Sequence, residues 1–124
     1  MKIKLTDQHG LIAFDYYINE VAKILVSSKG KLDARKDLIK LIETNVMLLE
    51  LKDLICKTAI KKAQMQHSIT IKKATTIKIS PMQGYTIIAF LPEYERSGGN
   101  KYGDYVAFFI QQLKDKICKE LLTN

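Results

Sequence analysis

The titratable side chains of this chain do not show the spacing that acid–base catalysis requires. Neither His9 nor His67 has a neighbouring carboxylate or nucleophile in the sequence that makes a case for catalysis. Asp15 and Glu20 lie five residues apart and do not share a helix face. Asp53 is the one charged residue on an apolar stripe, and we expect it to pair with a lysine at the helix border or to mark a subunit contact, rather than to act in catalysis. We therefore predict no catalytic residue and no enzymatic activity.

The two cysteines, Cys56 and Cys118, are far apart in the sequence and lie within helical patterns. Neither has a second cysteine or a histidine at the spacing of a metal site. Free cysteines are among the residues most often buried, so we expect two reduced thiols in the core. The sequence predicts no metal and no cofactor.

A segment rich in glycine and tyrosine, at 92–103, precedes the last predicted helix and contains Arg96 and Lys101. Unpaired amides and the helix dipole can hold an anion at such a place. The glycine spacing matches neither the Walker nor the dinucleotide-binding fingerprint, however, and Asp104 at the expected helix cap would repel phosphate. We interpret the segment as a surface connection, in which Arg96 and Lys101 remain candidate nucleic-acid contacts.

The chain is strongly basic, with a formal net charge of +7 and a pI near 9.4. A positive surface attracts phosphate polymers and other anionic partners. Because nearly all the cations are lysine, we expect any nucleic-acid contact to be to the backbone rather than to bases. An AT-rich genome is the alternative explanation for the lysine content.

Length and hydropathy indicate one α+β domain over residues 1–124. A chain of this size buries roughly two-thirds of its unfolded surface on folding, which suffices for a single core. No apolar run approaches the ~18 residues of a membrane span, and the N-terminus lacks the apolar middle of a secretory signal. We therefore expect no membrane contact and a cytoplasmic location, or one within a virion.

Two long helical patterns occupy the first half of the chain, at about 8–27 and at 32–66. On the second, an apolar stripe with near-heptad spacing predicts the core face, and it comprises Ile39, Ile42, Val46, Leu49, Cys56, Ile60 and Ala63. A single helix of this length would be about 50 Å long, so we expect it to break at 43–45 or to pack on another subunit. The candidate contact of a homo-oligomer or protein assembly consists of Val46, Met47, Leu51 and Leu54.

The last third of the chain predicts strands and a final helix. Alternating apolar residues indicate a short strand at 2–5 and a longer one at 68–80. The segment 80–84 contains the Pro and Gly of a turn, and a second apolar run follows at 85–91. We therefore predict an antiparallel β-hairpin, followed by an amphipathic C-terminal helix from about Asp104.

If the N-terminal strand pairs with this hairpin, one face of the small sheet carries a row of lysines with an aromatic ring available for stacking. The candidate contacts to a DNA or RNA backbone are Lys2, Lys4, Lys72, Lys78, Phe90, Arg96 and Lys101. An ordinary solvated sheet face is the alternative interpretation.

The sequence thus predicts a small basic assembly or interaction subunit, of a size and composition typical of viral and mobile-element proteins. A sequence-independent nucleic-acid-binding protein is the alternative. A basic ribonuclease is a third hypothesis, but it would need a convergent polar site that the sequence does not show.

Overall fold

The computed structural model describes residues 2–5, 8–66, 75–96 and 104–123. Its elements, in chain order, are β1 (Lys2–Leu5), α1 (Gln8–Gly30), α2 (Leu38–Gln66), β2 (Thr75–Lys78), α3 (Pro81–Ala89), α4 (Leu91–Arg96) and α5 (Asp104–Thr123). The predicted α+β class is confirmed, together with the N-terminal strand, the two long N-terminal helices and the C-terminal helix.

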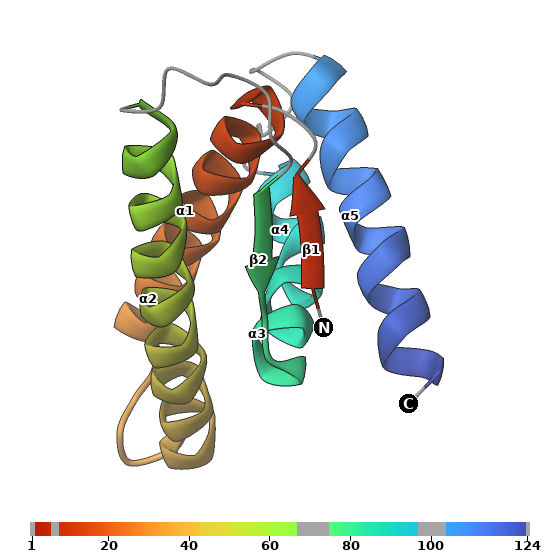
Figure 1. Cartoon of the computed structure of the whole chain (residues 1–124). Coiled ribbons are helices and arrows are strands. Elements are labelled where there is room, and N and C mark those ends of the chain that lie inside the picture. Colours follow the sequence, from red (N-terminus) through yellow and green to blue (C-terminus); the bar gives the residue numbers. More distant parts are fainter. Residues whose placement is uncertain (1, 6–7, 67–74, 97–103, 124) are drawn as a thin grey trace.

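The two strands form an antiparallel sheet in which β1 pairs with β2. Ile3 lies opposite Ile77, and both side chains are buried. Because successive side chains of a strand point to opposite faces, the intervening residues Lys2 and Lys4 are exposed on the outer face. In Figure 1 the sheet lies in front of α3 and α4, between α2 and α5.

The predicted β-hairpin is wrong, because the segment that follows the first strand is helical. Residues 80–84 start α3, with Ser80 as its N-cap and Pro81 in its first turn. Ser80 Oγ accepts a hydrogen bond from the Gln83 amide (3.1 Å), and Gln83 Oε1 accepts one from the Ser80 amide (2.9 Å). This reciprocal pair is a capping box, which favours a helix over a turn.

The helix also changes the role of Gly84 and of the residues after it. Gly84 donates its amide to the Ser80 carbonyl at 3.0 Å and lies in the first turn of α3, so it does not close a hairpin. The expected strand end at Leu91 is the start of α4, where Pro92 lies in the first helical turn. The expected strand residues 68–74 and the loop residues 97–103 lie outside the described residues.

Helix α1 is the centre of the core and contacts α2, α4, α5 and β1. Its side chains Phe14, Ile18 and Val21 are fully buried. Tyr17 is also buried, and its hydroxyl donates a hydrogen bond to the carbonyl of Ile87 in α3. The Tyr17 ring meets the Tyr94 ring edge-on, with the two centroids 5.0 Å apart. A polar group on α1 thus connects the centre of the core to α3 and α4.

Helix α2 is one continuous helix of 29 residues, so the break at 43–45, one of the two expected alternatives, does not occur. The helix begins at Leu38, and the expected start at residue 32 is wrong. Thr44 Oγ1 donates to the Lys40 carbonyl at 2.7 Å, as a threonine inside a helix does, and therefore does not cap a new helix. Figure 1 shows α2 packed beside α1, with the N-terminal part of α2 extending beyond the rest of the molecule at one end. The long helix is accommodated because only part of its length covers the core.

Burial gives Tyr17 a testable effect on stability at high pH. Burial, followed by the nearby Tyr94, Glu95 and Glu93, raises the pKa of the Tyr17 phenol far above its ordinary value. An unfolded chain ionises tyrosine near pH 10, so this contribution to stability is complete below about pH 10 and is lost as the pH rises further. Between about pH 10 and 12, the free energy of unfolding of Tyr17→Phe should therefore fall less steeply with pH than that of the unchanged chain.

At neutral pH the same Tyr17→Phe variant should lose about 1 kcal/mol or more, because the Ile87 carbonyl is left without its donor. Urea unfolding measured from neutral to alkaline pH checks both effects. Tyr85→Phe, at an exposed position on α3, is the matched control and should change neither. Parallel alkaline slopes for Tyr17→Phe and the unchanged chain would contradict the prediction.

Candidate interaction surfaces

The outer face of the sheet carries a cluster that we call the lysine face, formed by Lys2, Lys4, Thr76 and Lys78. Lys2 lies directly opposite Lys78, and Lys4 lies opposite Thr76. All four side chains are exposed, and no acidic residue occupies the outer face in the described part of the two strands. Like charges directly opposite each other in a strand pair are destabilising, so this arrangement costs the fold some stability.

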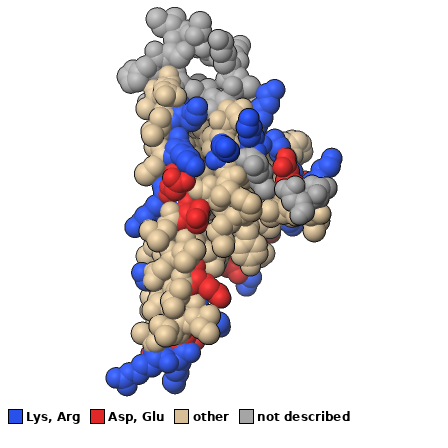
Figure 2. Space-filling model, turned by 60° about the horizontal axis from the view of Figure 1, so that its bottom comes forward, with Lys and Arg blue, Asp and Glu red and all other residues tan. Residues whose placement is uncertain are grey.

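One side of the molecular surface is rich in basic side chains. Figure 2 shows Lys and Arg side chains gathered in the upper half of this side of the molecule, with few Asp or Glu among them. Positive charge gathered in this way attracts polyanions.

Of the other residues predicted to contact nucleic acid, the structure describes Phe90 and Arg96, and neither lies on the two strands of the lysine face. Phe90 was placed there by an expected strand at 85–91, but it ends α3 and packs, half-buried, against the core. Arg96 ends α4 and forms an ion pair with Glu93, with 3.5 Å between Nη2 and Oε1. Lys72 and Lys101 lie outside the described residues.

One face of α2 is buried against the rest of the chain and includes Thr44, Leu51, Leu54 and Thr58. Leu51 and Leu54 were predicted to form an oligomer contact, but both side chains are 0% exposed within this chain. Met47 is half-buried against the same core. A contact between folded copies therefore cannot use Leu51 or Leu54, because both already pack in the core.

The opposite face of α2 exposes the stripe that was predicted to be the core face. We call it the outer stripe, formed by Ile39, Ile42, Val46, Leu49, Cys56 and Ile60. The five aliphatic side chains are between 41% and 73% exposed, and Cys56 is exposed as well. The prediction failed because the middle of α2 is apolar on most sides, so periodicity identified both apolar faces but not which one packs inward. Cys56 is thus not a core thiol, whereas Cys118 is half-buried.

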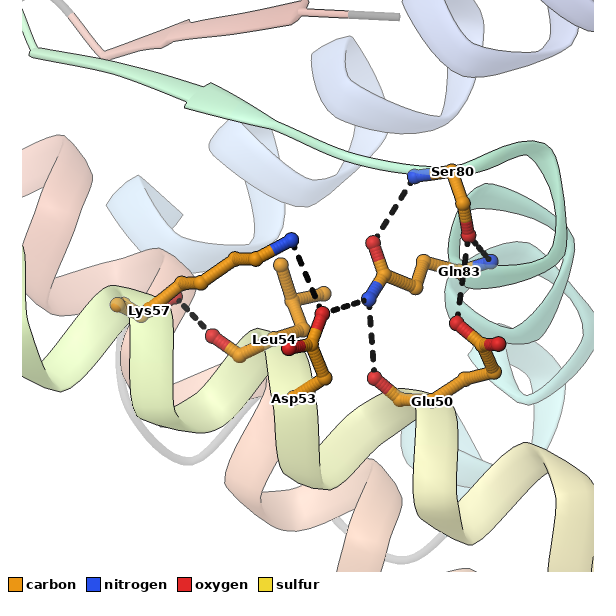
Figure 3. Close-up of polar contacts among 7 residues, drawn as sticks. Glu50, Asp53, Leu54, Lys57, Ser80 and Gln83 are labelled. Carbon is orange, nitrogen blue, oxygen red and sulfur yellow. Dashed lines mark hydrogen bonds and ion pairs between the residues drawn. The ribbon is translucent and has the colours of Figure 1, made fainter.

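A polar network beside the outer stripe fixes α3 against α2 (Figure 3). Gln83 is buried and donates from Nε2 to the Glu50 carbonyl (3.1 Å) and to Asp53 Oδ2 (2.8 Å). Lys57 Nζ forms an ion pair with the same Asp53 oxygen at 3.0 Å. Of the two roles expected for Asp53, pairing with a lysine at the helix border is confirmed. The hydrogen bond from Lys57, then that from Gln83, lowers the pKa of the Asp53 carboxyl, so it is ionised at neutral pH.

No group of three His, Cys, Asp or Glu side chains that could hold a metal ion occurs among the described residues. Within the same residues, no helix combines the length and the apolar character that crossing a bilayer requires. A pocket among α1, α3, α4 and α5 is lined by Tyr17, Ile87, Ile88, Leu91, Ile110, Leu113 and Lys114. This lining is mostly apolar and contains no carboxylate or imidazole for acid–base chemistry.

Comparisons with protein-family models, with curated proteins and with solved structures gave no match to this chain. The geometry of the lysine face and of the outer stripe is the basis for the functional proposal below.

Two nearby leucines of α2 can test which face of this helix packs against the core. Leu49 is 66% exposed on the outer stripe, whereas Leu51 is fully buried. In dilute solution, Leu49→Ser should change the free energy of unfolding by no more than about 0.5 kcal/mol, because a mostly exposed side chain loses few contacts. Leu51→Ser should cost about 3 kcal/mol or more, because it leaves a cavity and buries a hydroxyl. Equal losses in urea unfolding would mean that the two faces are assigned incorrectly.

Proposed function

We propose that this chain is a non-enzymatic interaction subunit that binds a protein partner through the outer stripe of α2. The observation that carries this proposal is a row of large aliphatic side chains left in water along a helix at the edge of the molecule. Single exposed apolar residues are ordinary, but a contiguous apolar row is typical of a protein–protein contact. A cytoplasmic or virion location is part of the same proposal.

The outer stripe is not needed to complete the core of the chain. The buried face of α2 supplies Leu51 and Leu54 to the core, and α1 is covered without help from the stripe. The Gln83 hydrogen bonds to Glu50 and Asp53 hold α2 in this rotation, so the stripe cannot turn inward without breaking them. Apolar area that is exposed at no benefit to the fold favours a role in binding.

Cys56 makes the proposal testable, because it places a native thiol on the outer stripe. A tagged chain is expressed in its source cells, and the rate of maleimide labelling at Cys56 in the extract is compared with the rate in dilute purified chain. A partner that occupies about nine-tenths of the chain should slow the labelling roughly tenfold, since only the free fraction reacts.

The matched control for Cys56 is a Leu122→Cys chain with Cys56→Ser and Cys118→Ser. Leu122 is 86% exposed on α5, away from the stripe, and its labelling should be equally fast in both samples. Equal labelling of Cys56 in extract and in purified chain would refute the proposed contact, as would equal slowing at both positions.

A second candidate function, sequence-independent binding of a nucleic-acid backbone, is favoured by the lysine face. Pairing Lys2 against Lys78 lowers the stability of the strand pair, and the described outer face of β1 and β2 has no carboxylate to compensate it. A bound phosphate would relieve this repulsion. Lysine contacts to phosphate carry no base information, so the binding would not depend on sequence.

Salt dependence tests the lysine face. Three lysines that each neutralise one phosphate should give a slope of about −2.7 in log affinity against log salt, at about −0.9 per phosphate on duplex DNA. Lys78→Thr should lower the magnitude of this slope by about 0.9 and, by removing the repulsion from Lys2, raise the free energy of unfolding by about 0.2–1 kcal/mol. Lys40→Thr, at the far end of α2, is the control. An unchanged slope in Lys78→Thr would exclude the face as the binding site.

A further inference from the structure

We infer that the partner on the outer stripe is a second copy of this chain, whose α2 packs antiparallel against the first as a two-stranded coiled coil. This inference rests on the proposed function and identifies the partner of the same surface. It is carried by the period of the stripe and by the charges along its two edges.

The stripe follows a heptad repeat over the length of α2. Its first core positions (a) are Ile39, Val46, Asp53 and Ile60, and its second core positions (d) are Ile42, Leu49, Cys56 and Ala63. An apolar repeat of 3.5 residues fits a partner helix that supercoils with it, and it fits a flat surface less well. From Ile39 to Ala63 the seam would extend about 36 Å at 1.5 Å per residue.

A second copy supplies the partner that this seam requires. A long coiled-coil contact needs a helix of equal length with the same period, and α2 itself meets both conditions. A two-fold dimer also closes on itself and leaves no second stripe exposed.

Antiparallel packing pairs each a residue with a d residue of the other copy. In the register with its two-fold axis beside Leu51, Ile42 of one copy meets Ile60 of the other, and Val46 meets Cys56. Leu49 then meets Asp53. This register includes every aliphatic residue of the stripe and places the two Asp53 side chains in different layers.

The charges that flank the stripe favour this orientation over a parallel one. Parallel packing would place Asp53 against Asp53 in the same layer and Lys52 beside Lys57 of the other copy. Asp53 is ionised through its contacts with Lys57 and Gln83, so two such carboxylates in one apolar layer would repel each other. Antiparallel packing places Glu43 beside Lys57 of the other copy on both sides of the two-fold axis.

Like charges also approach one another near the two-fold axis of the antiparallel register, where the two Asp53 residues lie in adjacent layers, about 6 Å apart along the axis. Glu50 approaches Glu50 on one edge, but each Glu50 carboxylate is held by Ser80 Oγ of its own chain at 3.4 Å (Figure 3). Lys52 approaches Lys52 on the other edge, where both side chains are exposed and their repulsion is screened by salt. The two favourable Glu43–Lys57 pairs remain.

Disulfide trapping of the full chain tests both the partner and the orientation. The starting chain carries Cys118→Ser, so that Cys56 is its one thiol. In the antiparallel register the two Cys56 residues are displaced by about ten residues, or about 15 Å along the axis, which is too far for a disulfide. Adding Val46→Cys places a thiol opposite Cys56 of the other copy. Mild oxidation should then give a covalent dimer with Val46→Cys and none without it.

A second measurement uses the mass of the chain in solution. Light scattering at about 100 μM should report a dimer, and Leu49→Asp should weaken association by about 100-fold or more because a charge enters the seam in both copies. Leu122→Asp, an exposed leucine on α5, should leave association unchanged. Both substitutions are at exposed positions, so the chains should remain folded.

The outcomes separate this inference from the proposed function. A Val46→Cys-dependent covalent dimer, with a dimeric mass that Leu49→Asp abolishes, supports the antiparallel pair. Efficient cross-linking of Cys56 alone would show a parallel pair and overturn the orientation. A strict monomer at about 100 μM would overturn the second copy as partner. If Cys56 is still protected in the cell extract in that case, the interaction function stands and the partner is a different protein.

Discussion

The fold depends on the need to cover α1 from several directions at once. Phe14, Tyr17, Ile18 and Val21 share one face of this helix, and all are withdrawn from water. Burying each large apolar side chain contributes about 1.5–3 kcal/mol. α2, α4, α5 and β1 all contact α1, so its buried side chains connect these elements. The Tyr17 hydroxyl helps to orient α1 relative to α3, because it donates a hydrogen bond to the Ile87 carbonyl.

With α1 as the centre, α2 must present one of its two apolar faces inward. Hydrophobic burial alone discriminates poorly between them, because both contain large aliphatic residues. Gln83 decides the choice, since its buried amide finds acceptors only when the Glu50 carbonyl and Asp53 face α3. The exposed ion pair between Asp53 and Lys57 contributes little stability by comparison. A directional hydrogen bond thus leaves the outer stripe in solvent.

Each of the two candidate surfaces is locally unfavourable for the isolated chain in water. The outer stripe exposes apolar area, and the lysine face sets two ammonium groups opposite each other. They belong to different elements, so occupying one leaves the other accessible. In the proposed dimer each copy would contribute its own lysine face. Two linked weak sites for a polyanion bind more tightly than either site alone when the polymer can reach both. Dimerisation through the outer stripe would therefore strengthen polyanion binding by the lysine faces.

The sequence predicted most strongly the elements whose signals are local. The alternation at 2–5 assigned the inward and outward residues of β1, and the helical periods located α1, α2 and α5. The segment 80–91 was misassigned because Ser-Pro followed by Gln and Gly suits both a turn and a capped helix start. A short apolar run such as 85–91 does not distinguish a strand from a buried helix. Lys2, Lys4 and Lys78 were placed on one face correctly, because β1 does pair with β2, whereas Phe90 was not.

By itself, the sequence of α2 determined a long helix with an apolar stripe of heptad spacing. Only the tertiary structure decided that this stripe faces solvent and that Leu51 and Leu54 face the core. Periodicity shows which residues share a face of a helix, because the helical turn is a local property. Which face packs inward depends on α1 and α3, whose contacts with α2 connect segments distant in the sequence, and no local pattern contains that information.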